Sequence, residues 1–93
     1  MTDPNTMSRD VIYSQISIER ERQDKIWGGP EYDDRNSPAD WVTYLTKHVG
    51  LAVHWPWNVT TFRHQMVVVA AVAVAAIEWA DRDGDSHERK VKR

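Results

Sequence analysis

The chain has 93 residues, a formal net charge of −2 and no cysteine. This length allows one domain at most, and without cysteine neither a disulfide framework nor a thiolate metal site can form. Because a chain this small buries only about two-thirds of its unfolded surface, we expect association with further copies to complete it.

The placement of apolar residues argues against secretion and membrane insertion. The first ten residues, MTDPNTMSRD, are polar, whereas a secretory leader needs an apolar segment. The longest apolar run, Met66–Ile77, is shorter than the roughly twenty residues of a membrane span. Charges of both signs are spread along the chain, which disfavours a nucleic-acid partner. We therefore expect a cytoplasmic protein without a membrane partner.

The N-terminal third predicts one helix between two irregular segments. Residues 1–8 are expected to form a flexible arm, and a first helix is expected from Ser8, acting as its N-cap, to Trp27. The run Gly28-Gly29-Pro30 should end it, because glycine accepts the left-handed conformation of a helix end and proline cannot continue a helix. The charged residues 31–36 are expected to form a loop.

A second helix is predicted to begin at Ser37-Pro38-Ala39-Asp40, with serine as N-cap, proline in the first turn and an acid three residues after the cap. It should run to about His54. Gly50 lowers the stability of a helix interior by about 1 kcal/mol relative to alanine, so we expect a close helix contact there.

A third helix is predicted from Val59 to Arg82, capped by Asn58 or Thr60, and followed by a disordered basic tail over residues 83–93. The predicted ordered part is therefore a single helical domain over residues 9–82.

The segment Met66–Ile77 is apolar on every side of this third helix, so it must be covered on every side. Two short partner helices cover about half of it, and a second copy of the chain is the expected cover for the rest. The fold class that follows is all-α: a three-helix antiparallel hairpin or bundle completed by oligomerisation. The expected oligomer interface consists of Met66, Val69, Ala70, Ala73, Val74 and Ile77.

The chain contains five tryptophans. Trp41 and Trp79 are predicted to anchor the core, whereas Trp27, Trp55 and Trp57 lie at predicted helix ends. Tryptophan at such positions either stacks on a ligand or caps a small core, and we favour capping.

Two of the four histidines, His48 and His64, face each other if the second and third helices are antiparallel. A zinc site needs three or four ligands. We therefore predict interior or interface histidines and no metal site.

Several segments together carry a resemblance to a known family. They are Ile18–Gly28 (IERERQDKIWG), Asp40-Trp41-Val42, Val49-Gly50, and Phe62-Arg63 leading into Val67–Glu78. Over roughly residues 16–82 the chain resembles the small MazG-like proteins of phages and prophages, which belong to the all-α nucleoside triphosphate pyrophosphohydrolases. The opening segment is the distinctive part of this resemblance.

The resemblance implies a magnesium site built from two pairs of acids, one pair on each of two helices. In this chain the positions of the first pair hold His48 and Leu51, and the stretch expected to carry the second pair contains Arg63, His64, Gln65 and Val68 instead. From Trp41 to Ile77 there is no Asp or Glu at all. We therefore expect no catalytic residue and no resident cofactor.

The function predicted from the resemblance is a non-catalytic binding module in the cytoplasm of a host cell. Its expected partners are further copies of itself and either a nucleotide-like molecule or a host protein, the latter in an anti-defence role. One alternative is an active, magnesium-dependent pyrophosphohydrolase with relocated ligands, and another is a DNA-associated oligomer that uses the basic tail. The candidate ligand-binding residues are Lys25, Trp27, Lys47, His48, Arg63 and His64.

Overall fold

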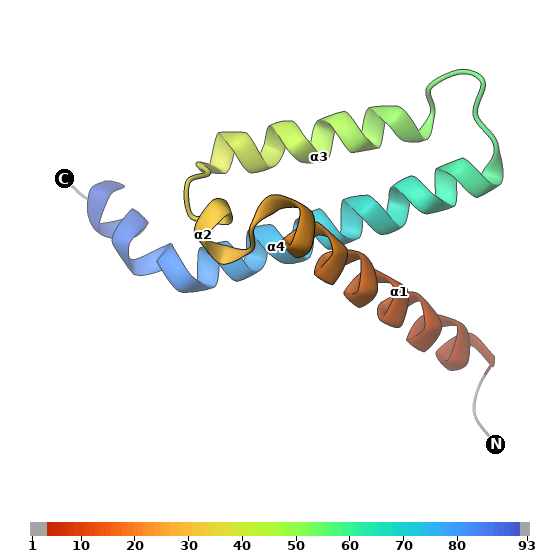
Figure 1. The fold of residues 1–93 in the computed structure, drawn as a ribbon, viewed down its shortest axis with the longest axis horizontal. Coiled ribbons are helices and arrows are strands. Elements are labelled where there is room, and N and C mark those ends of the chain that lie inside the picture. The colour runs from red at the N-terminus through yellow and green to blue at the C-terminus, as the bar shows by residue number, and fades with distance from the viewer. Residues whose placement is uncertain (1–3, 92–93) are drawn as a thin grey trace.

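The computed structural model describes the backbone of residues 4–91 and their side chains except at residues 4–7, 32 and 83–91. The elements are α1 (Pro4–Trp27), α2 (Pro30–Asp33), α3 (Pro38–Ala52) and α4 (Val59–Val91). The described part of the chain contains no strand, which confirms the all-α class. Helices α3 and α4 form an antiparallel hairpin, and α1 packs across α4 and then diverges from the hairpin (Figure 1).

Local capping signals set most of the helix ends. The Asp40 N–H donates to Ser37 Oγ at 3.2 Å, and the Ser37 N–H donates back to Asp40 Oδ2 at 2.9 Å, which confirms the predicted start of α3. At the start of α4, the Thr61 N–H donates to Asn58 Oδ1 at 2.8 Å, so Asn58 is the capping residue. After α1, both Gly28 and Gly29 adopt positive φ, as predicted.

Four local predictions are wrong. Helix α1 begins at Pro4 rather than Ser8, because proline suits the first turn of a helix; residues 1–3 of the predicted arm lie outside the described part. Residues 30–33, predicted in part as loop, form the short helix α2, whose first turn carries acids that suit its positive end. Helix α4 continues past Arg82 to Val91, through a stretch without proline. A side chain at Gly50 would meet open space, so no close helix contact lies there.

The apolar core lies along the α3–α4 seam. Its buried members are Trp41, Val68, Val72, Ala75 and Trp79, with Tyr44, Leu45 and Ala76 packed against them. The rings of Trp41 and Trp79 lie 6.2 Å apart, which confirms the two predicted anchors.

The other three tryptophans do not cap this core. Trp27 is 39%, Trp57 48% and Trp55 78% exposed, so the favoured capping role is wrong for the chain described here. The Trp55–Pro56 peptide bond in the α3–α4 connection is cis.

The long helix also has the length and composition of a membrane span. Residues 59–82 are the one segment of the described chain that passes this test, and core helices of proteins outside membranes pass it as well. One side of this segment, including Val68, Val72 and Ala75, is buried against α3. The predicted lack of a membrane partner stays a prediction.

The contact between α1 and α4 centres on a buried ion-pair network. The Arg20 guanidinium donates to Glu78 Oε1 of α4 at 2.8 Å and to Asp33 Oδ2 of α2 at 3.2 Å, and it also pairs with Asp24 one turn along α1. The side chains of Arg20 and Asp33 are only 11% and 6% exposed. Arg20 therefore joins three helices at one point.

We predict that Arg20→Met destabilises the fold by about 3 kcal/mol, because it leaves the buried Asp33 carboxylate without its cation. Arg9→Met, at an exposed position of the same helix, should change stability by less than about 0.5 kcal/mol. Urea unfolding followed by far-UV circular dichroism measures both. Equal losses for the two variants would contradict the central role of Arg20.

Candidate functional site

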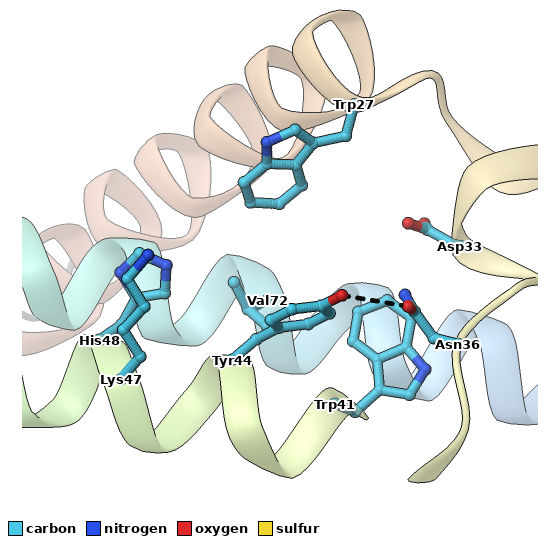
Figure 2. Close-up of a pocket in the computed structure, with 8 residues that line it drawn as sticks. All are labelled: Trp27, Asp33, Asn36, Trp41, Tyr44, Lys47, His48 and Val72. Atoms are coloured by element: carbon cyan, nitrogen blue, oxygen red, sulfur yellow. Dashed lines mark hydrogen bonds between the residues drawn. The ribbon is translucent and has the colours of Figure 1, made fainter. Parts of the chain in front are cut away.

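All four helices or their connections contribute to one cavity of about 200 Å³. Trp27 comes from the end of α1, Asp33 from α2, and Val72 from α4. The remaining wall is formed by Asn36, Trp41, Tyr44, Lys47 and His48. Figure 2 shows these eight side chains around the cavity.

Helix α3 supplies half of the wall because of its residue spacing. Trp41, Tyr44 and His48 lie three and four residues apart and so share one helix face. The Tyr44 hydroxyl donates to Asn36 Oδ1 at 3.3 Å, and its ring meets the Trp41 ring edge-on with centroids 6.2 Å apart. These contacts fix the position of the tyrosine ring within the site.

Trp27 faces this wall from the opposite side. In Figure 2 its indole lies across the cavity from Tyr44 and Val72. The indole is 39% exposed, whereas Trp41 behind the tyrosine is almost fully buried. The cavity is therefore an aromatic slot. Its Trp27 wall lies at the surface, and the opposite wall, formed by Tyr44 with Trp41 behind it, belongs to the core.

The two ends of the slot differ in chemistry. Lys47 and His48 lie at one end, and Asp33 and Asn36 at the other (Figure 2). The buried Nδ1 of His48 and the buried Nε1 of Trp41 have no hydrogen-bond partner within the described protein. Burial raises the pKa of the Asp33 carboxyl, and the positive charge of Arg20 opposes this rise. The slot thus offers a cationic end and a carboxyl–amide end.

A second, more open hollow lies between α1 and α4. It has about 310 Å³ of space and is lined by Gln15, Ile18, Glu19, Thr60, Arg63, His64 and Val67. The Arg63 guanidinium donates to Gln15 Oε1 at 2.6 Å across the two helices. Glu19 accepts two hydrogen bonds of 2.8 Å from Arg22 and one of 3.1 Å from Gln23.

The structure divides the six predicted ligand-binding residues into separate groups. Trp27, Lys47 and His48 line the aromatic slot, whereas Arg63 and His64 line the second hollow. Lys25 is exposed on α1 and lines neither. The expectation that His48 and His64 share one site is therefore wrong, because the two side chains line different cavities.

Asp33, Asn36 and Tyr44 also line the slot, and none of them was predicted from the sequence as a ligand-binding residue. Tyr44 lies three residues after Trp41 on the same helix, and this spacing was the available signal. Asp33 and Asn36 line the slot because the connection between α1 and α3 folds back towards it. No local sequence pattern predicts that conformation.

The residues predicted to form an oligomer interface lie on α4 away from the core. Met66, Val69, Ala70 and Ala73 are half-buried, and Val74 and Ile77 are exposed.

The residues at the expected metal positions do not fit a magnesium ion. Magnesium binds oxygen ligands, chiefly carboxylates, but these positions hold His48 and Leu51 on α3 and, on α4, Arg63, His64, Gln65 and Val68. Among the side chains that the structure describes, no three of the His, Asp or Glu type gather where they could hold a metal ion.

Comparisons of the chain with models of known protein families, with curated proteins and with solved structures found no match.

The hydrogen bonds to Glu19 predict a pH-dependent contribution to stability. Hydrogen bonding from Arg22 lowers the pKa of Glu19 below its usual 4.5, although burial opposes this shift. Above pH 4.5 we expect the native chain to be more stable than Glu19→Gln by about 1 kcal/mol, because Arg22 is itself half exposed. The difference should disappear as the pH falls through the lowered pKa of Glu19, since protonation then removes the charge in both states.

Thermal unfolding of both proteins between pH 3 and 7 tests this expectation. Glu21→Gln, at an exposed position of the same helix, should alter stability at pH 7 by less than about 0.5 kcal/mol. A difference between native chain and Glu19→Gln that persists at the lowest pH would show that packing, and not charge, is responsible.

Proposed function

We propose that the protein is a non-catalytic binding module for a nucleotide-like ligand: a planar heteroaromatic ring that carries an anionic group. The single observation that supports this most is the aromatic slot between Trp27 and Tyr44, with Lys47 and His48 at one end and Asp33 at the other.

The aromatic walls suit a flat ring system. Stacking of a base on an aromatic side chain contributes about 1–3 kcal/mol and tolerates different bases, because every base has a π-face. The slot, at about 200 Å³, is smaller than the roughly 300–1,000 Å³ typical of sites for drug-sized ligands. This size favours a single base between the walls, with its charged group outside the walls.

The cationic end suits a phosphate. Lys47 is exposed, so its ammonium group can pair with a phosphate at the mouth of the slot without being desolvated first. The half-buried ring of His48 lies beside it and has a ring nitrogen with no partner within the described protein.

The opposite end suits the polar edge of a base. The Asp33 carboxylate accepts one hydrogen bond from Arg20 through Oδ2 and has further lone pairs for the amino or ring N–H groups of a base. The Asn36 amide offers donors beside it. Because Asp33 lies at the far end from Lys47, its negative charge is kept away from the proposed phosphate position (Figure 2).

We propose binding without hydrolysis because a pyrophosphohydrolase needs metal-held phosphates, and the expected metal positions hold residues such as His48 and Leu51. The magnesium-dependent alternative stays a prediction from the sequence. A host-protein partner and a DNA-binding role for the tail remain predictions from the sequence.

We predict that nucleoside monophosphates bind, and that Trp27→Ala and Lys47→Ala each weaken binding about tenfold or more, which corresponds to about 1.4 kcal/mol. Isothermal titration with adenosine, guanosine, cytidine and uridine monophosphates measures this. Lys25→Ala is the matched control, because it removes the same charge from α1 near Trp27 but outside the slot. An equal loss for Lys25→Ala would indicate general charge attraction, and no binding of any of the four ligands would reject the proposal.

We further predict that nucleoside triphosphates with magnesium or manganese are not hydrolysed. The measurement is pyrophosphate release over several hours against a protein-free control. Release that scales with protein concentration and is lost in Trp27→Ala would replace the binding proposal with the catalytic alternative.

A further inference from the structure

Helix α4 is contacted on two sides and left open on a third. One side packs against α3 through Val68, Val72 and Ala75. On another side α1 crosses it, with Ile16 of α1 and Ala70 of α4 lining both hollows that flank the crossing. Helical spacing places Val69, Ala73 and Ile77 together on the remaining side. Ile77 is 61% exposed there.

The two hollows beside the crossing extend this open side onto α1. One has about 220 Å³ of space and is lined by Ile12, Ile16, Met66, Val67 and Ala70 together with Arg63. The other has about 400 Å³ and includes Tyr13, Val74 and the Arg20–Glu78 pair. Ile12 and Tyr13 are 40% and 59% exposed. The apolar face formed by α1 and α4, hereafter the α1–α4 face, is therefore continuous across both helices.

The accessible surface of the chain exceeds that of a compact monomer of the same mass. Its accessible surface is 7090 Å², whereas a monomeric protein of 10.8 kDa is expected to expose about 5,500 Å². The radius of gyration is 15.7 Å, against about 12 Å for a compact chain of this length. This excess of about 1,500 Å², summed over the whole chain, is of the same size as the roughly 1,000–2,500 Å² that each chain buries in an obligate homodimer.

We propose that a second copy of this chain covers the α1–α4 face, so that α1 and α4 of both copies form a bundle. A two-fold axis brings the same surface of each copy together, and an apolar stripe of small and branched residues is complementary to itself. Ala70 and Ala73 allow the helices to approach closely. A lipid bilayer is a poorer cover, because the Arg20–Glu78 ion pair lines the larger hollow and would have to enter hydrocarbon.

This surface is separate from the aromatic slot, so the two proposals can fail independently. The slot lies between α3 and the end of α1, whereas the predicted dimer surface lies on the sides of α1 and α4 that face away from α3.

Light scattering coupled to size-exclusion chromatography tests the proposal. The native chain should have twice the 10.8 kDa mass of one copy. Ile77→Glu should reduce the mass to one copy, or unfold the chain, because the charge enters the dimer surface. Val42→Glu is the matched control: Val42 on α3 is also 61% exposed, but it lies away from the α1–α4 face, and the variant should stay folded with the native mass.

Each outcome decides for or against the proposal. Since Ile77 is exposed in a single chain, unfolding of Ile77→Glu alongside a folded Val42→Glu supports a fold that depends on the second copy. A single-copy mass for the native chain at micromolar concentration overturns the proposal, and so does a mass that Ile77→Glu leaves unchanged. Sedimentation of a single-copy native chain with phosphatidylcholine–phosphatidylglycerol vesicles would identify a bilayer as the cover instead.

Discussion

The Arg20 guanidinium is the interaction on which the placement of the first two helices depends. The α3–α4 hairpin has an apolar core of its own, and the Arg20 side chain joins both α1 and α2 to α4 through charged groups. Arg20 pairs with Glu78 on α4 and with Asp33 on α2, and it does so with little exposure to solvent. A buried ion pair of this kind adds little net stability, yet removing one partner is strongly destabilising. It therefore acts mainly to fix one arrangement of the helices.

The shape of the aromatic slot depends on this ion-pair network. Asp33 is both a partner of Arg20 and part of the wall, and Trp27 lies two turns beyond Arg20 on the same helix. A shift of α1 would move the Trp27 indole away from Tyr44 and open the slot (Figure 2). The proposed binding site and the ion-pair network are thus coupled, because Asp33 belongs to both.

Local signals predicted the starts of α3 and α4, whereas contacts between residues far apart in the sequence could not be predicted from them. Ser37 and Asp40 form a reciprocal cap within four residues, and Asn58 accepts a hydrogen bond from the backbone of Thr61, three residues later. Because both caps are local, the starts of α3 and α4 could be predicted from the sequence. The pairing of Arg20 with Glu78 joins residues 58 positions apart, and the sequence around neither residue predicts this contact.

The candidate site was predictable only in part, for the same physical cause. Lys47 and His48 were chosen from the resemblance, and Trp27 from its position at a helix end; the fold brings all three to one slot. His64 was expected beside His48, but it lines the hollow between α1 and α4, because α1 approaches α4 on the side away from the slot. The apolar character of α4 was evident from its composition. That α1 contributes to the α1–α4 face could not be predicted, because it depends on where α1 crosses α4 near Ala70.

The central claim, that the aromatic slot takes a nucleotide-like ring, is tested most directly by the five tryptophans themselves. Fluorine NMR of the chain labelled with 5-fluorotryptophan resolves them, and single Trp→Phe variants assign the signals. On titration with a nucleoside monophosphate we expect the signals of Trp27 and Trp41, which line the slot, to shift together. The signals of Trp55 and Trp57, in the exposed α3–α4 connection, should stay in place. Shifts confined to Trp55 and Trp57, or no shift at any tryptophan, would contradict the account.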